Sequence, residues 1–175
     1  MKLKPIVYKA LTAMLLGLLV TITSRADSLP EYKMKAAFLY NFVQLTEWPK
    51  SSETLLRICV VGQDPIVEAL QDIEGSEVNG RRIKVVQLPD VSGDSLCDAL
   101  YLSESESIDV KGVISKLGES PVLTVSDNID VAKSGVMISM FPMSKRLVFN
   151  VNAESAKRAH LTLSSRLLRL AKHVD

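Results

Sequence analysis

The sequence predicts an α/β protein, a layered sandwich in which helices flank a mostly parallel sheet. Short runs rich in Val, Ile and Leu alternate with helix-length segments, the order typical of parallel strands joined by helical crossovers. Two neighbouring apolar runs near the C-terminus, residues 136–141 and 146–151, predict an antiparallel C-terminal hairpin at one edge of the sheet. These observations indicate one domain with a single sheet.

Local signals place the individual helices and strands along the first part of the chain. Pro49 ends the first helix, Asp64 is positioned to cap the second, and Gly118 ends the third. The short apolar runs between these helices are typical of buried strands. In chain order we expect a helix over 28–47, a strand over 55–62, a helix over 64–73, strands over 81–88 and 99–102, a helix over 107–118, a strand over 121–127 and a helical turn over 128–135.

The C-terminal region is expected to consist of the hairpin and one long helix. Pro142 lies in the turn of the predicted hairpin, and Asn152 is positioned to cap a helix that extends to about His173. This helix combines an apolar stripe with several Lys and Arg residues, which is typical of a helix packed on a core. Asp127 is expected to cap the helical turn that follows it rather than to bind a cation.

The first 26 residues have the three-part pattern of a secretory signal peptide. Three lysines form a basic start, residues 10–22 are uncharged and mostly apolar, and small residues precede a cleavage position after Ala26. A membrane span needs ~20 apolar residues, so this run is short for an anchor, although an uncleaved anchor is the alternative interpretation. We therefore expect an exported protein whose mature domain comprises residues 27–175.

The mature chain shows few signs of nucleic-acid binding or catalysis. Without the four basic residues of the signal peptide, 17 basic and 20 acidic residues remain, a weakly acidic balance of mixed sign. The sequence contains neither a phosphate-binding glycine loop nor the nucleophile elbow of hydrolases. His160 and His173 lie too far apart on the predicted helix to share a metal ion. We therefore predict a non-enzymatic protein with no cofactor, no metal and no nucleic-acid partner.

The chain has two cysteines, Cys59 and Cys97. In an oxidising compartment an isolated pair most simply forms a disulfide, and two buried free thiols are the alternative. A bridge that closes a loop of this length could stabilise the fold by about 4 kcal/mol on the chain-entropy model.

Two features of the C-terminal region could belong to a protein interface. Phe141 and Met143 are large apolar residues at the expected tip of the hairpin, where polar residues are usual. Leu161 and Leu168 broaden the apolar side of the predicted last helix, so that a second apolar edge could meet a partner. In both cases, packing of these residues within the domain is the alternative.

Five segments of the chain together form a recognisable pattern. They are EYKMKAAFLYNFVQLTEWP at 31–49, LRICVVGQDP at 56–65, VNGRRIKV at 78–85, PVLTVSD at 121–127 and LVFNVNAESAKRAHLTLSSRLLRLAKHV at 147–174. In this order they resemble the YfiR family of periplasmic regulators, and the resemblance covers nearly the whole mature chain. The first and the last segments are the most specific.

The resemblance implies a regulatory function in the periplasm. Proteins of this family bind the periplasmic sensor domain of an inner-membrane diguanylate cyclase and repress it, which lowers cyclic-di-GMP and biofilm formation. The resemblance also implies an outer-membrane-associated protein that sequesters the regulator, and an α/β sandwich that often forms a homodimer. The alternative function is a periplasmic small-molecule binding module, with a crevice lined by the loops after Val61, Ser103 and Ser126.

The chain departs from the family pattern at several positions. Cys59 and Cys97 correspond to one cysteine pair of the family, but the second pair that some members have near the hairpin is missing here. Redox control through that second pair is therefore not expected. Asp98 stands where the family often has histidine.

Overall fold

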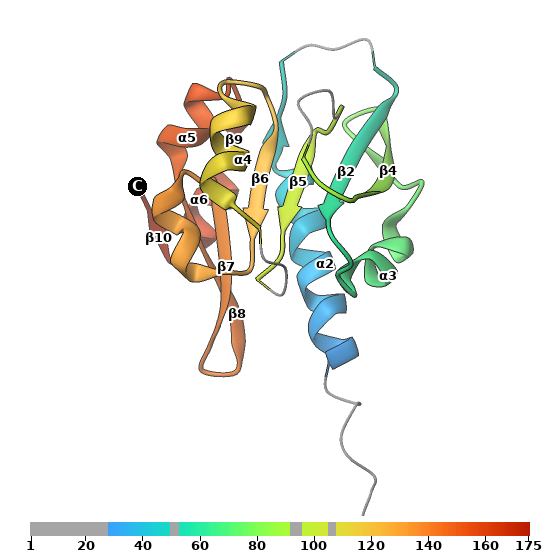
Figure 1. Cartoon of the computed structure of the whole chain (residues 1–175), viewed down its shortest axis with the longest axis horizontal. Helices are drawn as coiled ribbons and strands as arrows, with labels where there is room; N and C mark the ends of the chain where they lie inside the picture. Colours follow the sequence, from blue (N-terminus) through green and yellow to red (C-terminus); the bar gives the residue numbers. More distant parts are fainter. Residues whose placement is uncertain (1–27, 50–52, 92–95, 105–107) are drawn as a thin grey trace, which may run out of the picture.

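The computed structural model describes residues 28–49, 53–91, 96–104 and 108–175, and the predicted signal peptide lies outside these ranges. The described residues form one eight-stranded sheet with helices on both of its faces, together with a separate two-stranded ladder (Figure 1). The predicted fold class, an α/β sandwich with a mostly parallel sheet, is confirmed. Within the described ranges, no helix combines the length and apolar character needed to cross a membrane.

The eight-stranded sheet has the order β10-β8-β7-β6-β5-β2-β4-β3. Its strands are β2 Leu55–Val61, β3 Glu77–Val78, β4 Arg81–Leu88, β5 Ala99–Leu102, β6 Leu123–Ser126, β7 Ile138–Met143, β8 Arg146–Val151 and β10 His173–Val174. The five strands from β7 to β4 in this order run parallel, whereas β3 and β8 are antiparallel to their neighbours β4 and β7. β10 pairs in parallel with β8 and forms the edge of the sheet. The hairpin of β7 and β8 is therefore not at the edge, where the sequence predicted it.

Helices cover both faces of this sheet, which explains why the central strands β5 and β6 are buried along their whole length. One face carries α2 Ser28–Gln44, α3 Ile66–Leu70, α5 Ala153–Arg158 and α6 Ser165–Leu170, and the other carries α4 Val110–Leu117 and the 3-10 helix η3 Ile129–Ser134. Along β2, Ile58 and Val60 belong to the core beneath α2, whereas Cys59 and Val61 belong to the core beneath α4. Such two-sided burial is typical of parallel sheets.

The two cysteines are joined on the α4 side of the sheet. Cys59 of β2 and Cys97, two residues before β5, form a disulfide with their Cα atoms 5.9 Å apart. The disulfide links two strands that also pair directly with each other, at the centre of the sheet. The expectation of a disulfide, rather than of two free thiols, therefore agrees with the structure.

The prediction of a single long C-terminal helix is wrong. α5 ends at Arg158, and His160 has a backbone φ of 57°, a left-handed conformation that no α-helix continues through. The short strand β9, Thr162–Leu163, follows, and then the Ser164 side chain caps α6 by accepting a hydrogen bond from the Leu167 N–H. Helical spacing of apolar residues therefore continued across a segment in which the backbone leaves the helix twice.

The first helix also ends earlier than expected, for a related reason. α2 ends at Gln44, and Thr46–Glu47 form the short strand β1, which pairs antiparallel with β9. The Ser164 N–H donates to the Leu45 carbonyl at 2.9 Å and extends this ladder. The ladder holds the end of α2 against the connection between α5 and α6.

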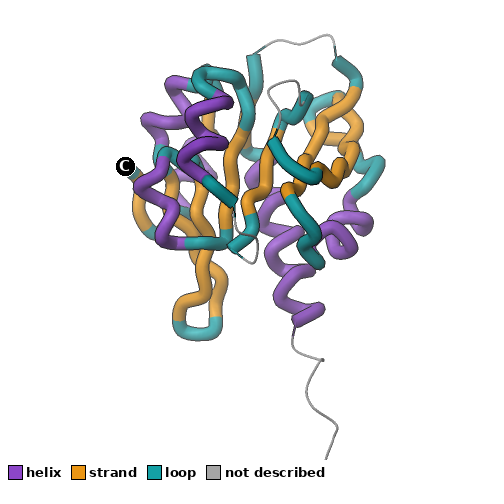
Figure 2. Tube along the Cα trace, in the orientation of Figure 1, coloured by secondary structure: helices purple, strands orange, loops and turns teal. Residues whose placement is uncertain are grey.

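The predicted hairpin is present, but Pro142 is not in its turn. The turn is Ser144-Lys145, whose φ values of 50° and 65° match the two-residue turns that hairpins favour. Pro142 lies within β7, opposite Leu147. Because β6 pairs with β7 only as far as Ser139, Pro142 lies where the hairpin projects beyond the sheet and no neighbouring strand needs an N–H group (Figure 2).

Reduction of the disulfide should lower the free energy of unfolding. The bridge closes a loop with a sequence separation of 38 residues, for which the chain-entropy model gives about 4 kcal/mol. Urea unfolding of the mature chain with and without reductant measures the difference. The Cys59→Ala/Cys97→Ala double variant is the control and should not respond to reductant. A loss below about 1 kcal/mol in the unsubstituted chain would contradict this role of the bridge.

Candidate functional site

The carboxyl ends of the neighbouring strands β2, β5 and β6 lie next to one another at one end of the sheet. The chain reverses its strand order here, because β4 lies on one side of β2 and β5 on the other. Ligands of doubly wound sheets bind at such a switch point. Three buried polar residues follow these strands, Asp64, Ser103 and Asp127. This is the place where the sequence predicted a small-molecule crevice as the alternative function.

The first turns of α2 bring a buried cation, the Lys35 ammonium, to these strand ends. The Lys35 ammonium lies 2.8 Å from an Asp127 carboxylate oxygen and 2.7 Å from a Glu31 carboxylate oxygen. The other Asp127 oxygen accepts a hydrogen bond from the Glu104 N–H at 2.7 Å. Both Lys35 and Asp127 are more than nine-tenths buried. The ion pair therefore joins α2 to the ends of β5 and β6 inside the protein.

A second buried contact closes the neighbouring part of the same end of the sheet. The Ser103 hydroxyl donates a short hydrogen bond to the Asp64 carboxylate. The other Asp64 oxygen accepts from the Ile66 N–H at 2.8 Å, next to the start of α3, although the cap position of α3 is Pro65 and not Asp64 as expected. Both carboxylates at the switch point therefore have partners within the chain. A hollow of about 260 Å³ remains on the α4 side, beside Val61 and Lys116.

Asp127 does not have the role that the sequence predicted. The cap of η3 is the next residue, Asn128, whose side chain accepts a hydrogen bond from the Asp130 N–H. Asp127 is directed to Lys35 instead. Sequence reasoning missed this pair, because the two residues are 92 positions apart and nothing local links them.

The surroundings of Lys35 favour its charged form. Burial lowers the pKa of Lys35, but the hydrogen bonds with Asp127 and Glu31 outweigh burial, so the pKa lies above its ordinary value of 10.5. The protonated Lys35 ammonium therefore contributes fully to stability at pH values below about 10.5 for as long as its carboxylate partners are ionised, and this contribution is lost as the pH rises through the raised pKa of Lys35. Burial, followed by the negative charge of Asp127, raises the pKa of Tyr101, which keeps this phenol neutral.

This end of the sheet is a closed polar cluster. Each charged group in it already has a partner of opposite charge or a hydrogen-bond donor. Across the ranges that the structure describes, no three His, Cys, Asp or Glu side chains converge on a possible metal position. The cluster fixes the position of α2 and leaves none of these carboxylates free for a ligand.

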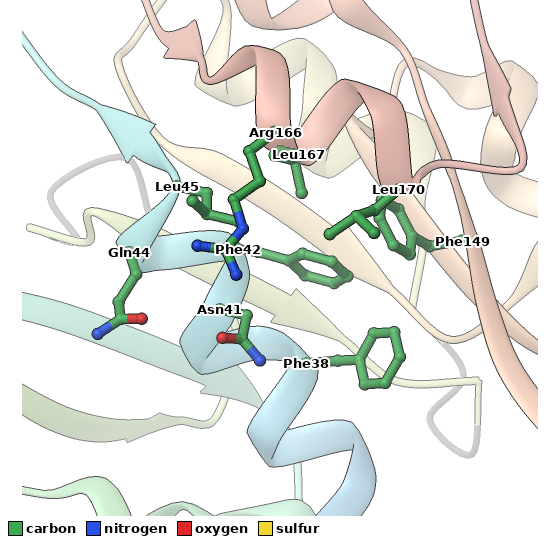
Figure 3. A pocket seen from close by; sticks show the side chains of 9 residues that line it. All are labelled: Phe38, Asn41, Phe42, Gln44, Leu45, Phe149, Arg166, Leu167 and Leu170. Atoms are coloured by element: carbon green, nitrogen blue, oxygen red, sulfur yellow. The ribbon is translucent and has the colours of Figure 1, made fainter.

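An open site lies beside the C-terminal half of α2, in a groove between α2 and α6 (Figure 3). Its cavity volume is about 270 Å³. Three phenylalanines form its floor with edge-to-face rings, whose centroids are 4.8 Å apart for Phe42 and Phe149, 5.9 Å for Phe38 and Phe42, and 6.1 Å for Phe38 and Phe149. The residues that line the groove are Phe38, Asn41, Phe42, Gln44, Leu45, Phe149, Arg166, Leu167 and Leu170.

Two residues of α6 give this groove its character at the surface. Leu170 is 63% exposed, although it is a large apolar residue. The Arg166 side chain extends from α6 toward the α2 side of the groove (Figure 3). No hydrogen bond or ion pair joins Arg166 to another residue in the part of the chain that the structure describes. The groove therefore combines an apolar floor with an unpaired cation at its mouth.

The four residues that the sequence suggested for partner binding lie outside this groove. Phe141 and Leu161 are buried, and the Lys172 ammonium lies 5.3 Å from the centre of the Phe141 ring. Leu168 is half-buried against the core, and Met143 is 40% exposed near the hairpin tip. The sequence showed apolar residues on α2 and α6, but it could not show which of their faces meet.

The fold and these two sites define a class of protein, an α/β domain whose buried carboxylates at the strand ends are paired within the chain and which presents an apolar groove to the outside. The chain belongs to the YfiR/HmsC-like family, whose model matches residues 32–172. This is a family of periplasmic, regulatory and non-catalytic proteins, generally associated with the periplasmic domain of a diguanylate cyclase.

A solved structure also resembles this chain, the conserved domain protein from Vibrio cholerae O1 biovar eltor strain N16961. The TM-score is 0.57 at 10% sequence identity, and the match covers 82% of this chain. It covers 60% of the Vibrio chain, so this protein spans about three fifths of that length. At this identity the likeness shows a shared fold.

Replacement of Lys35 by methionine should destabilise the protein because it leaves Asp127 buried without its cation. Removal of one partner from a buried pair costs ~3 kcal/mol or more. Lys33→Met on the same helix is the matched control, since Lys33 is exposed and its contact with Asp72 is 3.5 Å long; we expect a change within about 0.5 kcal/mol. Urea unfolding measures both.

The double variant Lys35→Met/Asp127→Asn tests the same pair independently of lost packing. The double variant should lose clearly less stability than the sum of the losses of the two single variants. Each single variant leaves one buried charge without its partner, whereas the double variant removes both charges. Strictly additive losses would show that Lys35 and Asp127 do not act as a pair.

Proposed function

We propose that the mature domain binds the periplasmic sensor domain of an inner-membrane diguanylate cyclase and represses the enzyme, which lowers cyclic-di-GMP and biofilm formation. The observation that carries this proposal is the family match over residues 32–172. The predicted signal peptide supports it, because export places the domain where such a sensor domain is exposed.

In this proposal the protein acts by binding alone. A regulator that prefers one conformation of a sensor domain shifts the sensor toward that conformation, and the shift is limited by the difference in affinity for the two states. The closed polar cluster at the strand ends is consistent with this mode of action, because it leaves the outer surfaces of a fixed scaffold to make the contacts.

The hairpin tip is one contact surface that we propose. Met143 exposes apolar area there, and it lies beyond the last residue of β7 that pairs with β6. Phe141 and Leu161 are buried and Leu168 is half-buried, so these three would reach a partner only after a rearrangement. We also propose an outer-membrane-associated protein that sequesters the regulator, and a homodimer, as further states of the same chain.

Deletion of the gene should raise cellular cyclic-di-GMP, because the cognate cyclase would no longer be repressed. The measurement is cyclic-di-GMP in extracts of paired strains with and without the gene, followed by biofilm mass. The matched control is the same deletion in a strain that lacks the cyclase, where no rise is expected. An unchanged level in a strain that expresses the cyclase would rule out repression.

A further inference from the structure

We propose that the groove between α2 and α6 binds a partner segment in which an aromatic side chain lies next to a carboxylate. The inference rests on the proposed function in one respect, since we expect this segment on the periplasmic domain of the regulated cyclase. The groove itself is defined by Phe38, Phe42, Phe149, Arg166 and Leu170, independently of that assignment.

The floor of the groove is suited to an aromatic side chain. Phe38, Phe42 and Phe149 already meet in edge-to-face contacts, the arrangement that aromatic rings prefer, and a fourth ring can extend it. The cavity of about 270 Å³ is larger than the ~150 Å³ that holds a benzene ring in an apolar protein cavity. One large side chain, with part of its backbone, therefore fits.

The charge at the mouth of the groove favours a negatively charged group on the partner. Arg166 is the one charged residue among those that line it. The two lining amides are neutral and already donate within α2, Asn41 to the Ala37 carbonyl at 2.9 Å and Gln44 to the Tyr40 hydroxyl at 2.9 Å. A carboxylate that approaches Arg166 over an apolar floor forms a charge-assisted hydrogen bond, which is stronger than a neutral one.

The charges around the groove favour a different protein over a second copy of this chain. A two-fold contact centred on the groove would bring the same surface of both copies together. Each copy would then bring Arg166 to the contact, and the residues that line the groove include no acidic side chain to pair with it. An acidic segment of another protein meets the same surface with complementary charge.

A peptide library tests the chemistry of the occupant directly. A random 12-residue library displayed on phage is selected on the purified mature chain and depleted on its Arg166→Glu variant. We expect the enriched peptides to share an aromatic residue with Asp or Glu within four positions, about one helical turn. An enriched set without acidic residues, or no enrichment at all, overturns the proposal.

Fluorescence anisotropy with the best peptide then locates the contact. We expect Arg166→Glu and Leu170→Asp each to weaken binding by about tenfold or more. Arg169→Glu is the matched control, because it removes an exposed arginine from the same helix but lies outside the groove lining, and it should change the affinity by less than about threefold. Equal losses at Arg166 and Arg169 would indicate attraction by net charge and overturn the proposal.

A charge exchange gives the sharpest outcome. Replacing the acidic residue of the peptide by lysine should abolish binding to the unsubstituted chain and recover it with Arg166→Glu. Failure of this recovery overturns the pairing. Sedimentation of the mature chain and of Arg166→Glu reports the competing occupant, and a dimer that dissociates in the variant would assign the groove to a second copy.

The groove assignment and the proposed function can fail separately. If the Arg166→Glu chain restores repression in the deletion strain as well as the unsubstituted chain does, the regulator stands and the groove assignment fails. If the peptides bind as expected but the deletion leaves cyclic-di-GMP unchanged, the groove stands and its partner is another acidic protein.

Discussion

The buried ion pair between Lys35 and Asp127 determines where α2 lies on the sheet, and the groove depends on that placement. Two charges are tolerated inside the protein because each has a second partner, Glu31 for the ammonium and the Glu104 N–H for the carboxylate. The other end of α2 is held by the ladder between β1 and β9. A helix fixed at both ends presents the same residues, Phe38 and Phe42 among them, to α6.

The strands were the most predictable part of the fold, and the reason is their burial. β2 and β5 lie in a parallel sheet covered on both faces, so β5 is buried along its whole length and β2 is buried from Ile58 to Val61. The C-terminal helices were not predictable in this way. One left-handed residue, His160, and a two-residue strand interrupt a pattern whose apolar spacing continues to look helical. The Lys35–Asp127 pair, between distant positions, left no local signal at all.

The departure from the family pattern at Asp98 has a clear role in this structure. Its carboxylate accepts a hydrogen bond from the Arg57 N–H at 2.7 Å and forms an ion pair with Arg81 at 2.6 Å. These contacts join the segment after Cys97 to β2 and β4 near the amino ends of the strands. The carboxylate thus reinforces the same strand junction as the disulfide, and its partner Arg81 is available only because β4 begins beside it.

A regulator that performs no chemistry must obtain its whole effect from the difference between two affinities. To move a sensor from one state to the other almost completely requires ~5.5 kcal/mol of that difference. Burial of an aromatic side chain supplies roughly 1.5–3 kcal/mol, and a hydrogen bond to a charged group supplies roughly 1.5–3 kcal/mol. The phenylalanine floor and Arg166 together therefore supply roughly 3–6 kcal/mol, which reaches the required difference at the upper end of this range, provided that only one state of the partner exposes the segment. The selectivity of such a regulator would then lie in the partner's conformational change, and the rigid placement of α2 and α6 would keep the groove ready for it.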